Sequence, residues 1–294
     1  YEFTNVQLSP DGRSLSALTK LGQPGYNLVV LDRASGDVHQ VTSLEASEVR
    51  WYRWIGNDRL IFFYAEPNPR VAGFYVAGLD GKRARRQKDS WFWLSVANNN
   101  HSLGYVGPLG SAEAQVARCH GRNDAKPVRG KQPRYSHDGQ AARLLLDHDC
   151  RLRGIVEFVE AEEGRRYRLH YRTSLDERWR VIGEYLELDG HVLPLAFDYD
   201  NRHLFALSDM DRDTAALYRF DPETGELGEP VYANERYDVH DVILSDAEQR
   251  LVGVRYVADG PRTVWVEEKR ARLDAAIAEA LPEYAVHIEF SEDG

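Results

Sequence analysis

Residues 8–12 of this chain read LSPDG, a stretch with the composition of a tight turn between two strands. Pro10 suits the second position of a type I turn because its ring already holds φ near the required value, and Asp11 can hydrogen-bond to nearby backbone. Gly12 accepts the left-handed conformation that such a turn needs next. A short stretch of alternating apolar residues follows, so we expect a hairpin corner that leads into a strand.

Variants of this phrase return three times along the chain. Residues 135–139 read YSHDG, residues 290–294 read FSEDG, and a degraded copy, LSDAE, lies at 244–248. Each copy is entered from an apolar or aromatic residue. We therefore expect all of them to be the same structural corner of a repeating unit.

A second phrase consists of a strand, an aspartate and a turn that contains glycine. Its clear copies are NLVVLDRASGD at 27–37 and LYRFDPETGE at 217–226, and FYVAGLDGK at 74–82 is a shortened copy. The first copy begins about 20 residues after its LSPDG corner, which leaves room for two further short strands in each unit. Each unit is therefore expected to hold four strands.

The spacing of the corners defines the period. The distance from Ser9 to Ser136 corresponds to three units of about 42 residues, and that from Ser245 to Ser291 to one unit of about 46. A period of this length, built from short strands and turns, is typical of a β-propeller, in which each unit is a four-stranded blade. We predict an all-β chain that forms a β-propeller of six to seven four-stranded blades, the last of them incomplete.

One propeller domain is expected to span residues 1–294, with a single short helix near 267–281. The helix is predicted because Leu273, Ile277, Ala280 and Leu281 fall on one face. The expected blades lie at approximately 3–43, 48–88, 91–130, 133–184, 186–235 and 238–270, with the start of a seventh at 285–294.

Composition excludes several classes of function. The formal net charge of −10 is unfavourable for a nucleic-acid partner, and the basic stretch GKRARRQK at 81–88 is interpreted as a solvated strand because no aromatic residues are interleaved with its charges. The longest apolar runs are far too short to cross a bilayer. Cys119 and Cys150 are the only cysteines, and we favour two free thiols, although their spacing leaves pairing open.

The order of these motifs resembles the N-terminal propeller of prolyl oligopeptidase family serine peptidases, particularly the dipeptidyl aminopeptidase and acylaminoacyl-peptidase group. The resemblance covers essentially the whole chain. It rests on FTNVQLSPDGRSLSALTKLGQPGYNLVVLDRASGDVHQVT, WIGNDRLIFF, LYRFDPETGEL, DVILSDAEQRLVGVRYVADG and the helix that leads into LPEYAVHIEFSEDG.

The resemblance implies a domain that gates or orients peptides for an α/β-hydrolase domain of the same gene product. That catalytic domain is expected to be absent from this chain, which alone should hydrolyse nothing. The nearest match to the nucleophile elbow G-x-S-x-G, residues 12–16, lacks the last glycine and leads into a strand, so we assign no catalytic residue. The resemblance also favours a periplasmic location over a cytoplasmic one, although the sequence itself leaves the compartment open.

Three glutamates are the candidate substrate-binding residues. Glu160, Glu162 and Glu163 invite comparison with the paired glutamates that hold a peptide's amino terminus in dipeptidyl peptidases of this family, because converging carboxylates suit an ammonium group. They precede Gly164 and a second, arginine-rich strand, so a hairpin tip with cross-strand arginine partners is the favoured interpretation.

We expect no metal and no cofactor. Asp209, Asp211 and Asp213 alternate as at the start of a calcium loop, but the later glycine and glutamate of such a loop are missing. His137, His148 and His240 lack the spacing of metal ligands, so each is expected to be a hydrogen-bonded histidine of the surface or of a blade edge. The six tryptophans are expected to pack between sheets.

Two other functions remain open. One is a free-standing, TolB-like propeller that binds a protein or a small ligand, and the other is a propeller enzyme with its site in the central channel. A continuation of the gene that encodes G-x-S-x-G would exclude the first. An unfinished seventh blade would leave an unpaired strand edge, which predicts self-association.

Overall fold

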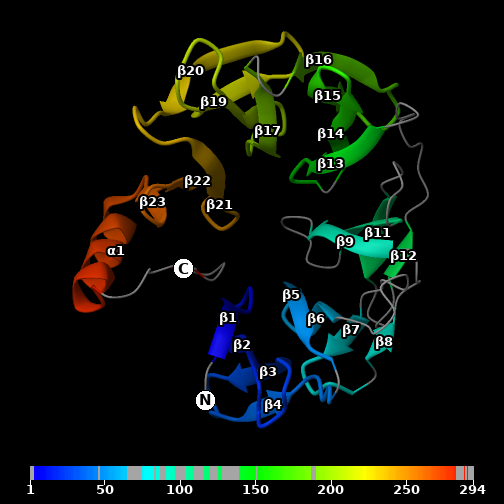
Figure 1. Ribbon diagram of the computed structural model, residues 1–294, viewed down its shortest axis with the longest axis vertical. Coiled ribbons are helices and arrows are strands. Elements are labelled where there is room, and N and C mark those ends of the chain that lie inside the picture. The colour runs from blue at the N-terminus through cyan, green and yellow to red at the C-terminus, as the bar shows by residue number, and fades with distance from the viewer. Residues whose placement is uncertain are drawn as a thin grey trace. The chain divides into compact units, whose positions relative to one another are not determined.

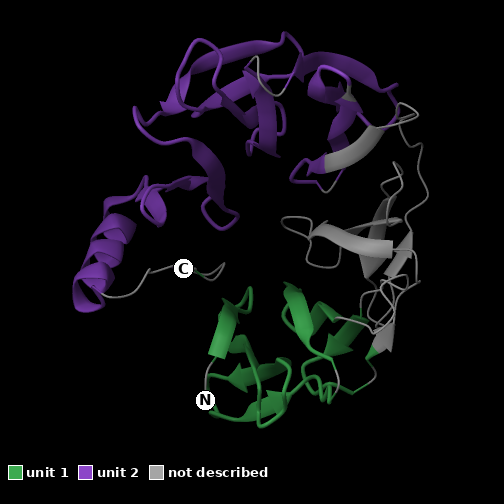
Figure 2. Ribbon diagram, viewed as in Figure 1, with its two compact units in different colours: residues 1–132, 289–294 green, residues 133–288 purple. Residues whose placement is uncertain are grey.

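The computed structural model describes residues 3–45, 47–64, 75–82, 84–86, 91–96, 103–108, 115–119, 125–127, 139–149, 151–186, 190–282, 288 and 290. For residues 85–86, 91–142 and 161, the description is limited to those stretches of backbone that lie in strands. The chain divides into two compact units, residues 1–132 with 289–294 and residues 133–288 (Figure 2).

The first unit contains three antiparallel sheets of four strands, each built from strands that are consecutive in the chain (Figure 1). The first sheet consists of β1 (Phe3–Leu8), β2 (Ser14–Thr19), β3 (Asn27–Asp32) and β4 (Val38–Gln40). The second consists of β5 (Val49–Ile55), β6 (Arg59–Tyr64), β7 (Tyr75–Gly78) and β8 (Arg85–Arg86). The third consists of β9 (Trp91–Val96), β10 (Leu103–Pro108), β11 (Gln115–Cys119) and β12 (Ala125–Pro127).

The second unit contains two more four-stranded sheets, a three-stranded sheet and one helix. The fourth sheet consists of β13 (Gly139–Leu146), β14 (Leu152–Ala161), β15 (Gly164–Tyr171) and β16 (Arg180–Leu186). The fifth consists of β17 (Val192–Phe197), β18 (Leu204–Ser208), β19 (Ala216–Asp221) and β20 (Glu226–Tyr232). The sixth consists of β21 (Val239–Ser245), β22 (Arg250–Val257) and β23 (Pro261–Trp265), and α1 (Glu268–Ala280) follows it.

The corner phrases occupy two different places. LSPDG at 8–12 joins β1 to β2, and LSDAE at 244–248 joins β21 to β22, as expected. The prediction for YSHDG was wrong, because Gly139 at its end already begins β13, the first strand of the fourth sheet. The first corner of that sheet lies instead at residues 147–151. The expected start of a seventh unit, at 285–294, lies outside the described residues except for 288 and 290.

The second phrase is the turn between the third and fourth strands of a sheet. In the first sheet, Asp32 Oδ1 accepts hydrogen bonds from the backbone N–H groups of Ala34 and Ser35, both at 2.9 Å. In the fifth sheet, Asp221 Oδ1 accepts one from the backbone N–H of Glu223 at 2.9 Å. The aspartate thus satisfies backbone donors that would otherwise point into the turn.

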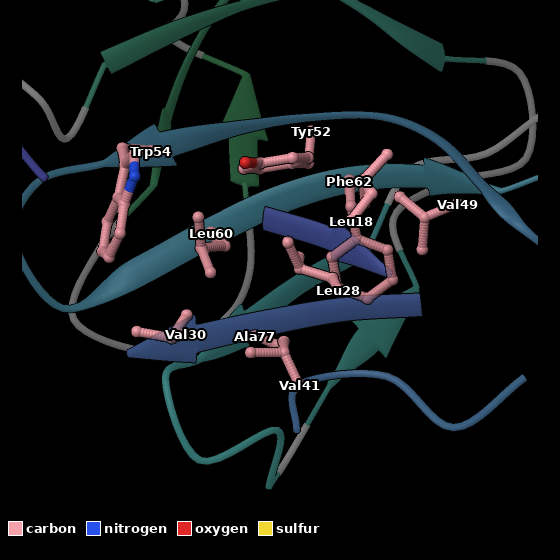
Figure 3. Close-up of a cluster of buried hydrophobic side chains, with 10 residues drawn as sticks. All are labelled: Leu18, Leu28, Val30, Val41, Val49, Tyr52, Trp54, Leu60, Phe62 and Ala77. Atoms are coloured by element: carbon pink, nitrogen blue, oxygen red, sulfur yellow. The ribbon is translucent and has the colours of Figure 1, made fainter. Parts of the chain in front are cut away.

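Hydrophobic side chains from the first two sheets form one core (Figure 3). Leu28 and Leu60 are fully buried there, and Trp54 is 7% exposed. Burial of each such side chain stabilises the fold by about 1.5–3 kcal/mol. The buried members are Leu18, Leu28, Val30, Val41, Val49, Tyr52, Trp54, Leu60, Phe62 and Ala77.

Two further cores lie in the second unit. One joins the fourth and fifth sheets through Tyr171, Phe197 and Phe220. The other joins the fifth and sixth sheets through Leu195 and Val254, among others. Neighbouring sheets of this unit are therefore held together face to face by apolar side chains, as blades of a propeller are.

A charged residue links helix α1 to the sixth sheet. Arg270 is 9% exposed, and its guanidinium bonds Glu248 in the corner between β21 and β22 as well as Glu267. Leu273 and Leu281, expected on the apolar face of the helix, are 45% and 46% exposed. No helix in the described residues is long and apolar enough to span a membrane.

Candidate functional site

The three candidate glutamates lie at the tip of the hairpin formed by β14 and β15. The turn has Gly164 at φ +118°, a conformation that glycine adopts readily. Glu160 Oε1 accepts a hydrogen bond from Arg165 Nε at 3.1 Å, and Glu163 Oε2 accepts one from Arg166 at 3.3 Å. Glu162 is exposed at the same tip. Two of the three carboxylates are thus engaged by arginines of the partner strand.

Ser14, the serine of the nearest elbow-like sequence, lies in a structural turn. It is 7% exposed at the start of β2, and its backbone N–H donates to Ser9 Oγ at 2.9 Å. Its backbone oxygen accepts from the backbone N–H of Ser9 at 2.8 Å. A nucleophile at a strand-to-helix elbow has to be exposed. The described structure around Ser14 does not provide that geometry.

The acidic loop of residues 209–213 follows β18 and accepts a hydrogen bond from the segment that precedes β17. Asp209 Oδ1 accepts the backbone N–H of His191 at 2.9 Å, and Asp211 has φ +59°. No group of three or more metal-ligating side chains is found within the described ranges.

His148 belongs to a contact between sheet corners. Its ring stacks on that of Tyr199 with centroids 3.8 Å apart, and its Nε2 lies 3.0 Å from the carbonyl oxygen of Phe197. The hydroxyl of Tyr199 donates to Asp246 at 2.5 Å. These three residues come from the first corners of the fourth, fifth and sixth sheets, so they connect successive corners. His240 is exposed, and His137 lies outside the described residues.

The first strand of each of the six described sheets carries one extra residue in its pairing with the second strand. In β17, for example, Pro194 pairs with Ala206 and Ala196 with Phe205, so Leu195 is the extra residue. Such bulges interrupt the ladder, leave backbone groups unpaired and redirect the side chains beside them. The repeat of this feature was not predicted from the sequence.

Residues beside these bulges connect the first strand of one sheet to the first strand of the next. Gln7 follows the bulge of β1, and its Nε2 donates to the carbonyl oxygen of Tyr52 on β5 at 3.2 Å. Arg143 follows the bulge of β13, and one of its terminal nitrogens donates to the bulged carbonyl of Leu195 at 3.4 Å. In both units, therefore, a side chain that follows a bulge donates to a backbone carbonyl of the first strand of the next sheet.

Arg143 also lies within the electrostatic reach of a charged pair on the sixth sheet. Asp241 follows the bulge of β21 and faces Arg255 across the strands, with the nearest nitrogen and oxygen 3.5 Å apart. Burial lowers the pKa of Arg143 below its usual value, and the negative charge of Asp241 opposes that shift. No sequence motif indicated the contact of Arg143 with Leu195 or the ion pair of Asp241 with Arg255.

Solved structures identify the class of fold. No family model matches the chain, and no curated protein sequence matches it. A prolyl endopeptidase matches 90% of the chain with a TM-score of 0.58 at 9% identity. Prolyl oligopeptidase B from Galerina marginata matches 87% with a TM-score of 0.56 at 10% identity. The β-propeller domain of the Trilobed protease from Pyrococcus furiosus matches 90% with a TM-score of 0.51 at 12% identity.

These likenesses confirm the predicted fold, an all-β propeller built from four-stranded blades. They also confirm, at the level of the fold, the resemblance to the propellers of prolyl oligopeptidases. The chain spans 41% of the length of the prolyl endopeptidase, 38% of prolyl oligopeptidase B and 82% of the Trilobed protease domain.

Proposed function

We propose that this chain is the propeller domain of a serine peptidase and that it gates or orients peptide substrates for an α/β-hydrolase domain outside residues 1–294. The step from fold to role is an analogy, because propellers serve many functions. The chain itself then contributes no catalytic residue, and the peptidase activity belongs to the longer gene product.

One observation carries the proposal. Nearly the whole chain, 90% of it, matches a prolyl endopeptidase but accounts for 41% of that protein's length. The pattern suits a domain whose partner is the remainder of such a protein. The buried environment of Ser14 supports the rejection of residues 12–16 as a nucleophile elbow.

The test is an activity assay of this chain and of the product of its complete gene. Short aminoacyl and acyl-aminoacyl chromogenic substrates are suitable, since they need no gate to reach a hydrolase site. We expect hydrolysis by the longer protein and none by residues 1–294. A gene that stops soon after residue 294, with both preparations inactive, would support a free-standing binding module instead.

Recognition of a peptide's amino terminus by Glu160, Glu162 and Glu163 stays a prediction. The ion pairs of Glu160 and Glu163 with arginines favour a stabilised hairpin tip. An amino-terminal role requires that replacement of Glu162 by glutamine raise KM for peptides with a free amino group and not for the same peptides acylated.

Self-association is also proposed, through the unfinished seventh blade expected at 285–294, which lies outside the described residues except for 288 and 290. An unpaired strand edge can pair with another chain. Light scattering of the isolated chain should then show a mass that rises with protein concentration. A constant monomer mass up to high concentration would argue against this contact.

A further inference from the structure

We propose that one apolar face of helix α1 is a docking surface for the domain that follows the propeller in the longer gene product. This α1 face consists of Leu273, Ile277 and Leu281. The inference rests on the proposed function and deepens it, because it assigns the element of this chain that contacts the α/β-hydrolase domain. The partner it fits is an apolar surface that is covalently linked to this chain.

The α1 face continues a side of the helix that is buried only at its first turn. Arg270 and the three residues of the face follow one another at intervals of three or four, so they lie on one side of the helix. Arg270 is buried and bonds Glu248 in the corner between β21 and β22. Leu273 and Leu281 are 45% and 46% exposed, and Ile277 is half-buried. The second unit therefore covers the start of this side and leaves its apolar part open to solvent.

The helix lacks features that stabilise a short helix by itself. It has 13 residues, a length at which an isolated helix is marginal in water. The side chain of its N-cap residue, Glu267, makes no capping hydrogen bond, and its last turn holds no basic residue. Within α1, all of which is described, only Arg270 is buried. Because helices of this length depend on the packing of an apolar face, we expect a further surface to cover the α1 face.

The small size of the α1 face favours a partner on the same polypeptide. A stable interface between separate proteins buries about 800 Å² on each side. Three large apolar side chains, all of them already partly covered, offer much less. A covalently linked domain meets the face at an effective concentration in the millimolar range, so a small contact is enough to hold it.

The position of α1 in the chain suits this partner. It follows β23 directly and is the last helix or strand within the described residues (Figure 1). A hydrolase domain joined after residue 294, as the proposed function requires, therefore begins close to α1 in the sequence.

Hydrogen exchange followed by mass spectrometry tests the contact in the 294-residue chain and in the complete gene product. In the isolated chain, we expect the amides of residues 271–281 to exchange rapidly, since the α1 face is open. In the complete product, the same amides should exchange at least about tenfold more slowly, because docking makes local opening of the helix less favourable.

Variants separate the α1 face from other exposed apolar residues. Leu273→Gln and Leu281→Gln, introduced together, remove the apolar contact and place a good helix former at both positions. They should abolish the slow exchange of α1 in the complete product and leave the isolated chain nearly unchanged. Leu175→Gln is the matched control, because Leu175 is also 46% exposed but lies between β15 and β16. It should leave the exchange of α1 slow.

Equal exchange of α1 in the two unmodified proteins would overturn the docking contact, whether or not the double variant folds. Exchange in the isolated chain that slows as its concentration rises would also overturn it, because a second copy would then cover the face.

The outcomes for the contact and for the proposed function can be told apart. A complete product that hydrolyses peptides while α1 exchanges equally in both proteins would retain the function and refute the contact. Slow exchange of α1 in a complete product that hydrolyses nothing would retain the contact and refute the peptidase role. A gene that ends soon after residue 294 would overturn both.

Discussion

At the scale of single residues, arginines with buried guanidinium groups contribute to the stability of the fold. Arg153 is 7% exposed, donates to the hydroxyl of Tyr171 at 2.7 Å and lies 3.5 Å from Asp147. It also bonds the carbonyl oxygen of Asn201 in the neighbouring sheet. Removal of one partner from such a cluster leaves other polar groups buried and unsatisfied, which costs more than the contact itself contributed.

We therefore expect Arg153→Ala to lower the free energy of unfolding by about 3 kcal/mol or more. The matched control is Arg151→Ala, whose ion pair with Asp149 has both side chains 55% exposed and should contribute less than about 1 kcal/mol. Urea unfolding followed by tryptophan fluorescence measures both values. Equal effects of the two substitutions would show that burial of Arg153 does not matter.

Asp200 provides a pH-dependent prediction. Burial raises its pKa, but hydrogen bonds from the side chain of His203 and from backbone N–H groups outweigh burial and lower the pKa to about 2. Because the pKa in the folded protein is below the unfolded value, Asp200 stabilises the fold above about pH 4 and loses this effect as the pH falls toward 2.

Asp200→Asn should accordingly reduce the free energy of unfolding at pH 7 by about 1 kcal/mol, a modest value because solvent screens the partly exposed carboxylate. At pH 2.5 the difference from the unmodified protein should be smaller. Urea unfolding at both pH values provides the comparison. A difference that grows as the pH falls would contradict the assigned sign.

Sequence reasoning at this scale succeeded where partners are close in the chain. The hairpin tip of Glu160 and Arg165 was predictable because a glycine turn brings the two strands together within a few residues. The hydrogen bond from Arg143 to the carbonyl oxygen of Leu195 was not predictable, because the two residues come from different sheets. No local sequence pattern predicts a contact between residues so far apart in the chain.

At the scale of elements, the turns between third and fourth strands contain glycines whose surroundings differ. Gly81 has φ +67°, and a Cβ atom there would lie 2.6 Å from the carbonyl oxygen of Val41. Gly36 has φ +77°, and a Cβ atom there would meet nothing within 4 Å. Both positions use the left-handed region that favours glycine, but only the first also lacks space.

Gly36→Ala should therefore cost about 1 kcal/mol of stability through backbone strain alone. Gly81→Ala should cost clearly more, about 2 kcal/mol or above, since the backbone of the neighbouring segment has to move as well. Thermal unfolding of both variants ranks the two costs. The reverse order would mean that the contact with Val41 does not constrain the turn.

The corner phrases show what turn chemistry can and cannot predict about elements. Pro, Asp and Gly specify a tight turn, so LSPDG at 8–12 and LSDAE at 244–248 were recognised as corners between first and second strands. The same chemistry does not fix the position of a phrase within a sheet, because Gly139 at the end of YSHDG already begins the first strand β13. Position within a sheet depends on pairing with distant strands, which the turn residues do not encode.

At the scale of the whole molecule, repetition made the fold predictable. Phrases that recur about every 40 to 50 residues predicted four-stranded units because each unit is one local antiparallel sheet. The proposed function was less accessible, because it rests on an analogy with longer proteins and not on residues of this chain. The likeness of the fold to solved propellers thus carries the functional argument.

The central claim is that residues 1–294 are the non-catalytic propeller of a serine peptidase. The most direct measurement is labelling of this chain and of the complete gene product with a serine-reactive fluorophosphonate probe, under the same conditions. The account predicts that only the longer protein is labelled. Labelling of the 294-residue chain itself would contradict it, because a nucleophilic serine would then lie within the propeller.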